Sequence, residues 1–136
     1  MPRVEKQEPT QQEIDAVTAH VDKYGKSLIE PDIDSLKSCF HDEATIFSTV
    51  GDQVIGGHIQ WLYDNMKENG GITGLEYKIK VLSVTRSTAV AQIELYRESP
   101  EYEITDTLAL IKLPSGEWTI VSKIFHVYQY NMTLAA

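Results

Sequence analysis

Residues 102–130 constrain the fold more than any other stretch, because they have the pattern of two long β-strands joined by a tight turn. The two segments read YEITDTLALIKL and EWTIVSKIFHVYQY, and Pro114-Ser115-Gly116 lies between them. Proline cannot donate to a β-ladder and glycine adopts positive φ at little cost, so this tripeptide favours a hairpin turn. We therefore expect a long antiparallel hairpin over these residues.

The register of this hairpin follows if Lys112 pairs with Glu117 across the turn. Because side chains alternate between the two faces of a strand, three predicted pairs then share one face: Leu108 with Val121, Ile104 with Phe125, and Asp106 with Lys123. That face is apolar except for one acid and one base placed opposite each other. The pattern predicts a charged pair inside an otherwise apolar surface.

Length and composition are those of one globular domain. The chain has 136 residues, 42% of them hydrophobic, which suits a single core. We expect a flexible polar tail over residues 1–9 and one domain over residues 10–136. A net charge of −8, with the basic residues scattered along the chain, argues against nucleic-acid binding.

The sequence also indicates where the protein resides. No apolar run approaches the roughly 20 residues that a membrane-spanning helix needs, and the first residues lack the apolar segment of a secretory signal. The single cysteine, Cys39, cannot form an internal disulfide and indicates a reducing compartment. We expect a cytoplasmic protein, with Cys39 a small buried hydrophobe in preference to a nucleophile.

Helical signals dominate the first part of the chain. Thr10 followed by Glu13 is a capping box, and the positions after it form one apolar stripe at helical spacing: Ile14, Val17, Val21, Tyr24 and Leu28. Pro31 is expected to close this helix, and Asp32 or Asp34 to cap a short second helix over residues 35–40. Tyr24 lies on the stripe, either as a core tyrosine with a satisfied hydroxyl or as a hydrogen-bond donor in a pocket.

The rest of the chain alternates between strand and turn signals. After a turn at His41-Asp42-Glu43, strands are predicted over residues 44–50 and 53–55, and Gly56-Gly57 is expected to end the second of them. A third helix follows, with its buried face formed by Ile59, Leu62, Tyr63 and Met66. Two further strands, 75–84 and 89–97, lead into the hairpin. This order predicts an α+β fold in which helices cover one face of a curved sheet.

Three stretches of this sequence resemble the NTF2-like superfamily, the cone-shaped fold shared by ketosteroid isomerase and the SnoaL-type cyclases. They are YGKSLIEPDIDSLKSCFHDEATIF, VIGGHIQWLY and GEWTIVSKIFHVY, and "FHDEA" with "WTIVSKIFH" is most similar to its lumazine-binding branch. The resemblance implies three N-terminal helices packed on a strongly curved, mostly antiparallel sheet of about six strands. It also implies an apolar pocket without a cofactor, and a homodimer formed through the outer face of the sheet.

Comparison with the isomerases of that superfamily bears on activity. The resemblance places Tyr24 where those enzymes keep an oxyanion-hole tyrosine, and it places Ser48 where they keep the general-base aspartate. Their second acid falls near Leu108, two residues after Asp106 on the same face. A serine cannot take a proton at neutral pH without a base beside it, so the resemblance argues against steroid isomerisation by that mechanism.

Asp106 and Lys123 form the sharpest candidate site. Burying an ion pair costs several kcal/mol per ion unless further hydrogen bonds compensate, so such a pair needs an explanation. One interpretation is a pocket floor where Lys123 holds an oxygen atom and Asp106 relays a proton. The other is a cross-strand salt bridge at a wetter edge of the sheet.

These considerations set the predicted site. Catalytic roles fall on Asp106, Lys123 and Tyr24, and the ligand is expected to contact seven residues: Tyr24, Ser48, Trp61, Leu108, Val121, Lys123 and Phe125. The four histidines have no metal-binding spacing, so no metal is predicted. Of these four, His41 is placed in a loop and His58 at a helix entrance. His126 is placed with Trp118, Ile120 and Ile124 on a second apolar face that suits a dimer surface.

Three functions remain open from the sequence, and one of them, a protein-interaction module that uses the cone mouth or a sheet face, has no sequence feature of its own. The other two have such features. The first is a small-molecule-binding domain with an apolar pocket, which needs a few convergent polar groups and no reaction. The second is a cofactor-independent enzyme (an isomerase, dehydratase or cyclase) that acts on a small hydrophobic cyclic or polyketide-like substrate. In both cases the expected partners are a small-molecule ligand and a second copy of the chain, without nucleic acid or membrane.

Overall fold

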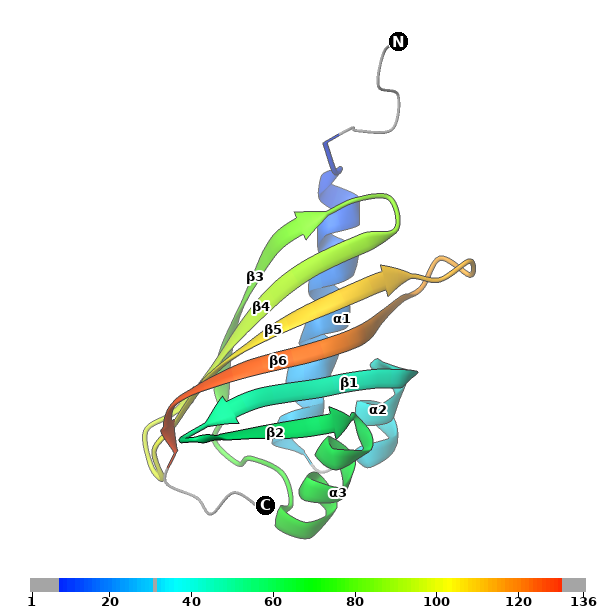
Figure 1. Ribbon diagram of the computed structural model, residues 1–136. Helices are drawn as coiled ribbons and strands as arrows, with labels where there is room; N and C mark the ends of the chain where they lie inside the picture. The colour runs from blue at the N-terminus through cyan, green and yellow to red at the C-terminus, as the bar shows by residue number, and fades with distance from the viewer. Residues whose placement is uncertain (1–7, 31, 131–136) are drawn as a thin grey trace.

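Figure 1 shows a computed structural model of the chain, in which residues 8–30 and 32–130 are described. Three helices and six strands follow one another along the chain: α1 (Gln11–Ile29), α2 (Ile33–Ser38), β1 (Phe40–Val50), β2 (Gln53–His58), α3 (Gln60–Asn69), β3 (Glu76–Val84), β4 (Thr88–Arg97), β5 (Tyr102–Lys112) and β6 (Trp118–Tyr130). The predicted α+β class is confirmed. Most of the expected N-terminal tail, and Pro31, lie outside the described residues.

All six strands form one sheet in the order β2-β1-β6-β5-β4-β3. Neighbouring strands are antiparallel except β1 and β6, which are parallel. The sheet curves in front of α1 in Figure 1, so one of its faces is covered by helices and the other is open. Among the described residues, no helix is long and apolar enough to cross a membrane.

The expectation of three N-terminal helices is wrong for the third helix. Only α1 and α2 precede the first strand, and α3 lies between β2 and β3. These two strands are the opposite edges of the sheet. The chain must therefore cross from one edge to the other at this point, and α3 occupies part of that crossing beside the helix-covered face (Figure 1).

The helix signals near the N-terminus are confirmed in detail. Thr10 Oγ1 accepts a hydrogen bond from the Glu13 backbone N–H at 3.1 Å, and Glu13 Oε1 accepts from the Thr10 N–H at 2.9 Å. The apolar stripe is buried at Val17, Val21, Tyr24 and Leu28. Asp32 caps α2 by accepting from the Ser35 N–H. These local rules place α1 with its apolar stripe against the sheet.

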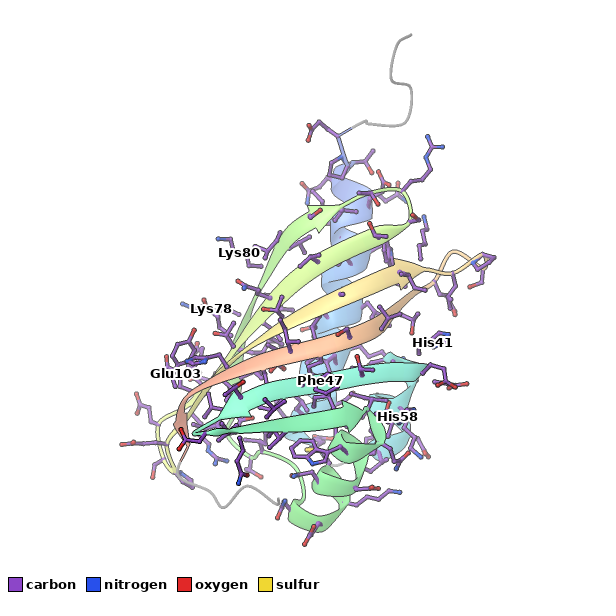
Figure 2. The ribbon with its side chains drawn as sticks, in the orientation of Figure 1. His41, Phe47, His58, Lys78, Lys80 and Glu103 are labelled. Atoms are coloured by element: carbon purple, nitrogen blue, oxygen red, sulfur yellow. The ribbon has the colours of Figure 1, made fainter. Side chains whose placement is uncertain are left out.

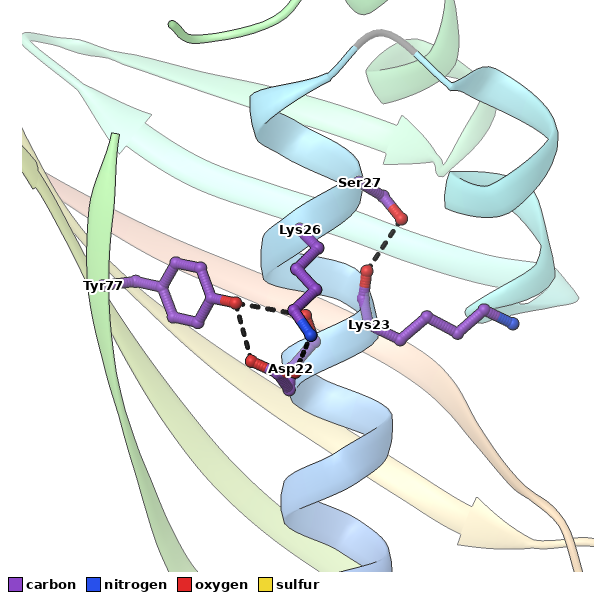
Figure 3. Close-up of polar contacts among 5 residues, drawn as sticks. All are labelled: Asp22, Lys23, Lys26, Ser27 and Tyr77. Atoms are coloured by element: carbon purple, nitrogen blue, oxygen red, sulfur yellow. Dashed lines mark hydrogen bonds and ion pairs between the residues drawn. The ribbon is translucent and has the colours of Figure 1, made fainter. Parts of the chain in front are cut away.

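A polar cluster ties α1 to the edge strand β3 (Figure 3). The Tyr77 hydroxyl donates to Asp22 Oδ1 at 2.6 Å, and Lys26 Nζ lies 2.9 Å from the other oxygen of the same carboxylate. The Tyr77 ring lies so close to Gly25 that a Cβ there would be 2.8 Å from a ring carbon. Glycine at this position lets the helix approach the sheet, which brings Tyr24 into the core.

The boundaries of β1 and β2 differ from the predicted ones. β1 begins at Phe40, so His41 lies within a strand and not in a loop. β2 continues to His58 through both glycines. A Cβ on Gly56 would lie 2.0 Å from the Ile46 carbonyl oxygen. The glycine at this point allows the two strands to pack closely, where the sequence had suggested a strand end.

The hairpin of β5 and β6 forms as predicted, but its register is different. Lys112 pairs with Trp118, and Val121 is an extra residue in β6, because the neighbouring pairs are Leu110 with Ile120 and Ala109 with Ser122. Relative to the predicted register, the pairs between the turn and the bulge are shifted by one residue, and the pairs from the bulge to Ile104 are shifted by two. A β-bulge of this kind inserts one unpaired residue into a strand, and the alternation of faces is restored after it.

Because of this register, several of the predicted cross-strand partners and faces are wrong. Lys123 lies opposite Leu108 in place of Asp106, and Phe125 lies opposite Asp106 in place of Ile104. Val121 does not share the inner face but is half-buried in the bulge. Trp118 and Ile120, expected on the outer face, are buried in the core. Ile124 and His126 are exposed on the outer face, as predicted.

A buried carboxylate at the floor of a small cavity

A cavity of about 60 Å³ lies between α3, the C-terminal end of α1 and the helix-covered face of the sheet. Its walls are mostly apolar, with Leu28, Ile46, Met66, Ile72 and Ile104 among the lining residues. Asp106 and Lys123 are the charged residues in its lining. The cavity therefore has the composition expected of a small-molecule site, an apolar enclosure with few polar groups.

A larger groove of about 700 Å³ lies at the ends of β4 and β5. Its lining includes four acidic side chains, Glu94, Glu98, Glu101 and Glu103, but none of the polar residues that are buried in the described part of the chain. It is more open to solvent than the smaller cavity, and its four acidic side chains are exposed. Perturbed and desolvated groups concentrate at functional sites, so we assign the candidate site to the smaller cavity.

Three side chains from distant parts of the chain meet at the cavity floor. The Tyr24 hydroxyl on α1 donates a hydrogen bond of 2.5 Å to Asp106 Oδ2 on β5. Lys123 Nζ on β6 lies 3.5 Å from the same oxygen. Tyr24 and Asp106 are fully buried, and Lys123 is 6% exposed. Both donors thus converge on Oδ2, which leaves the other carboxylate oxygen unengaged.

Asp106 Oδ1 is a buried oxygen with no hydrogen-bond partner among the described residues. Burial raises the pKa of Asp106, while the Lys123 charge and the Tyr24 hydrogen bond partly offset that rise. An unsatisfied buried polar atom is costly and needs an explanation. Asp106 lines the cavity, and Oδ1 is its oxygen without a hydrogen-bond partner in the described ranges.

Tyr24 donates a hydrogen bond to the Asp106 carboxylate and does not itself line the cavity. Burial, followed by the charge of Asp106 and the hydrogen bond to it, raises the pKa of Tyr24 well above its usual value. Its hydroxyl keeps its proton and directs it to Oδ2. A hydroxyl has one hydrogen to donate, so Tyr24 cannot bind a ligand oxygen while this bond exists.

Lys123 lies within cation–π distance of two aromatic rings. Its Nζ lies 5.3 Å from the centroid of the Tyr24 ring and 5.3 Å from that of Phe125. Cation–π contacts of this length stabilise an ammonium, most strongly in a desolvated site. In the observed register, which includes the bulge at Val121, Lys123 lies opposite Leu108, two residues nearer the turn than its predicted partner Asp106.

The predicted ligand-binding residues divide into two groups. Trp61, Lys123 and Phe125 line the cavity, whereas Ser48, Leu108 and Val121 do not. Leu108 is fully buried in the core. Ser48 Oγ donates to the Phe125 carbonyl oxygen at 2.5 Å, so the serine at the position of the isomerase base has a structural hydrogen bond.

Two asparagines in the cavity lining were missed by the sequence reasoning. Asn65 and Asn69 follow Trp61 at intervals of four residues along α3, and all three side chains line the cavity. Asn69 Nδ2 donates to Asn65 Oδ1 at 2.9 Å. The spacing of four was visible in the sequence, but the polar residues resembled an ordinary solvated helix face.

The histidines and the cysteine lie away from this site. His58 Nδ1 accepts the Gln60 N–H at 2.9 Å, which confirms a role at the entrance of α3. His20 Nε2 contacts the Cys39 carbonyl oxygen, and burial lowers the pKa of His20. Cys39 is buried, and burial raises its pKa to about 11. Within the described ranges, no cluster of three or more His, Cys, Asp or Glu side chains could hold a metal ion.

The sequence matches a known protein family. Residues 12–126 match the profile of the family described as "Putative lumazine-binding". The chain belongs to this family. The match spans all six strands except the last residues of β6, so the cavity lies within the family domain.

A sequence relative and a solved structure are similar to this chain over most of its length. The chain is 32% identical over 119 residues to Aldolase FrzH from Cladobotryum sp, which covers 88% of this chain and 94% of that protein. An NTF2-like protein of unknown function from Methylobacillus flagellatus has a TM-score of 0.81 and 28% identity, covering 92% of this chain and 99% of its own.

A more distant neighbour shows the fold alone. A ketosteroid isomerase-like protein from Erwinia carotovora atroseptica has a TM-score of 0.71 at 15% identity, covering 89% of this chain and all of its own. The expected NTF2-like architecture is therefore confirmed. The activity of this chain has to be argued from its own residues.

Proposed function

We propose that this protein is a cofactor-independent enzyme that transfers a proton to or from a small molecule bound in the cavity. The observation that carries the proposal is the unpartnered Oδ1 of the fully buried Asp106. The other oxygen is fixed by Tyr24 and Lys123. A buried carboxyl group held in this way, with its pKa raised by burial and one oxygen without a partner, is suited to accept and return a proton.

The roles of the site residues follow from their contacts. Asp106 accepts and returns the proton, Lys123 stabilises negative charge on the substrate, and Tyr24 positions Asp106. Trp61 and Phe125 form apolar walls against the ligand. The aldolase relative supports a substrate with an enolisable carbonyl, since aldol chemistry begins with loss of a proton beside a carbonyl group.

A non-catalytic binding domain is the second candidate function. The cavity of about 60 Å³ is far below the roughly 300–1,000 Å³ of typical small-molecule sites, so a ligand of more than a few atoms would extend out of it. The family description supports a planar heterocycle such as a lumazine as its ligand. Thermal stabilisation by lumazine, without any proton transfer in the assay below, would favour this candidate.

Solvent exchange tests the enzymatic proposal. The protein is expected to speed exchange of deuterium from D₂O into the α-positions of acetone or cyclohexanone, followed by NMR. Asp106→Asn should reduce the enzymatic rate at least about 100-fold, because general acid–base groups contribute 10²–10⁴. Asp52→Asn, which changes an exposed turn residue, is the matched control and should keep the wild-type rate. An unchanged rate in Asp106→Asn would refute the proposal.

We also propose a homodimer through the open face of the sheet. Large apolar side chains are exposed there, with Phe47 44% and Ile124 53% accessible, and Val54 and Tyr128 beside them. Figure 2 marks Phe47 on β1, Lys78 and Lys80 on the edge strand β3, and Glu103 on β5. An apolar centre with charged residues around it is the usual composition of a subunit interface.

A further inference from the structure

Lys123 is the basic residue in the cavity lining, and its neighbours there are one carboxyl group and two aromatic rings. The side chain is 8% exposed, and its Nζ lies 3.5 Å from Asp106 Oδ2. The same atom lies 5.3 Å from the centroid of the Tyr24 ring and 5.3 Å from that of the Phe125 ring. A carboxylate and two aromatic faces all attract positive charge. Removing that charge would also leave the Asp106 carboxylate buried without its counter-ion, which is costly.

The Lys123 ammonium has N–H donors in addition to the one directed at Asp106. An ammonium carries three N–H donors, and Asp106 is the single anionic partner of Lys123 within residues 8–30 and 32–130. Lys123 and Asp106 both line the cavity. A bound molecule can therefore receive a hydrogen bond from Nζ while Asp106 Oδ1 acts on a neighbouring atom of the same molecule.

We infer that Lys123 binds the oxygen of an enolisable ketone as a charged hydrogen-bond donor and forms no imine with it. This inference rests on the proposed function and specifies how the site handles its substrate. The carbonyl oxygen lies at Lys123 Nζ and the adjacent C–H at Asp106 Oδ1. Lys123 in this role replaces the tyrosine donor that the family resemblance suggested, since the Tyr24 hydroxyl is engaged by Asp106.

The step balances without any further reactant. The C–H bond beside the carbonyl breaks, and the proton passes to Asp106 Oδ1. The electron pair of that bond forms the new C=C bond, and the carbonyl π pair moves to oxygen as the enolate charge. Lys123 stabilises that charge, and the proton returns from Asp106 to carbon when the step reverses. Donors aimed at a developing oxyanion are commonly the largest single catalytic contribution.

The competing mechanism is an imine between Lys123 and the ketone. It requires a neutral amine to attack the carbonyl carbon and release water, and the resulting nitrogen would carry the substrate itself. Both mechanisms give the same α-proton exchange, so exchange by itself does not separate them. Covalent trapping and a lysine-to-arginine substitution do, because an arginine can donate to an enolate oxygen but does not form the aldolase-type imine.

The experiment measures both α-hydrogen exchange and covalent trapping, with cyclohexanone as the ketone. Wild-type protein in D₂O should exchange the α-hydrogens, and borohydride added during turnover should leave no reduced adduct on the Lys123 peptide by mass spectrometry. Lys123→Met should lower exchange by about 100-fold or more, the usual effect of losing an oxyanion donor. Lys123→Arg should keep the rate within about tenfold of wild type, and Lys112→Met, at an exposed position, is the control.

The outcomes separate this inference from the proposed function. An adduct at Lys123 with exchange that still depends on Asp106 would overturn the inference and leave proton transfer in place. Wild-type exchange in Lys123→Met would also overturn it. Absence of exchange in wild type would count against the proposed function and the inference together. If Lys123→Arg does not fold, borohydride trapping of the wild type still decides between the two mechanisms.

Discussion

At the scale of single residues, the two oxygens of Asp106 have different surroundings. Oδ2 receives the Tyr24 hydroxyl and lies beside Lys123, whereas Oδ1 has no partner in the described part of the chain. Burial raises the pKa of this carboxyl group, and the two neighbours oppose the rise. The balance between them sets how readily Asp106 takes or gives a proton, so Tyr24 and Lys123 tune the group that we place at the centre of the chemistry.

Tyr24→Phe tests this balance through the pH dependence of stability. The native state binds the Asp106 proton more tightly than the unfolded state, so between the ordinary and the raised pKa the unfolded state holds fewer protons. The Asp106 contribution to the free energy of unfolding therefore falls as pH rises through that window. Removing the Tyr24 hydroxyl should make the fall larger and extend it to higher pH, and should cost about 1–3 kcal/mol near neutral pH.

Denaturant unfolding across a pH series measures this effect. Other carboxyl groups have lowered pKa values, among them Asp22 beside Tyr77 and Lys26, and they change stability in the opposite direction. Each curve is therefore compared with the same protein carrying Asp106→Asn, and the difference isolates Asp106. Tyr77→Phe is the matched control and should leave the difference unchanged. A smaller pH-dependent fall in Tyr24→Phe than in wild type would contradict the interpretation.

At the scale of elements, the joint between α1 and β3 determines where Tyr24 lies. Gly25 follows Tyr24 on α1, and a Cβ at Gly25 would approach the Tyr77 ring carbons at 2.8–3.0 Å. The Tyr77 hydroxyl is fixed to Asp22 one turn earlier (Figure 3). These contacts fix α1 against β3 next to Tyr24, the residue that donates a hydrogen bond to Asp106. Asp22, Gly25 and Tyr77 themselves do not line the cavity.

Gly25→Ala should change sign with the residue at position 77. In the wild-type background the new methyl group collides with the Tyr77 ring, and overpacking of this kind costs about 1–3 kcal/mol. In a Tyr77→Ala background the collision is gone, and replacing a mid-helix glycine by alanine should stabilise the protein by about 1 kcal/mol. Urea unfolding of the four proteins in this double-mutant cycle measures both values. Equal effects of Gly25→Ala in the two backgrounds would show that the Tyr77 ring does not restrict this position.

At the scale of the whole molecule, the sheet has one face under helices and one open face. The covered face holds the cavity, and the open face carries the exposed apolar residues Phe47 and Ile124, which are paired neighbours on β1 and β6. The two surfaces lie on opposite sides of the same strands. A dimer formed through the open face would therefore leave access to the cavity past α3 unobstructed.

Ile124→Lys is expected to convert the proposed dimer to a monomer. A lysine at the centre of an apolar interface must be desolvated without a partner, which costs more than the interface can offset. Light scattering after size-exclusion chromatography, at tens of micromolar protein, measures the mass. Leu82→Lys replaces another exposed apolar residue, on β3, and should leave the mass unchanged. A wild-type monomer under these conditions would refute the dimer.

The local signals in the sequence determined most of the secondary structure. The capping box at Thr10, the apolar stripe of α1 and the alternation through β3 to β6 depend on contacts within a few residues, so they could be interpreted before any tertiary structure was known. The resemblance to NTF2-like proteins added the cone and its inner pocket. Where local signals were ambiguous, as at Gly56, the prediction was wrong, because a close approach of two strands and a strand end both call for glycine.

Only the tertiary structure decided how the site is assembled. Asp106 and Lys123 were correctly assigned to one face of the hairpin, but the bulge at Val121 made them diagonal neighbours in place of a directly opposed pair. Nothing in the local pattern marks that bulge, because its position is set by how β6 packs on both β5 and β1. The Tyr24 hydrogen bond spans 82 residues of sequence. The free oxygen of Asp106 exists because distant elements converge on its other oxygen, and short-range patterns cannot encode that convergence.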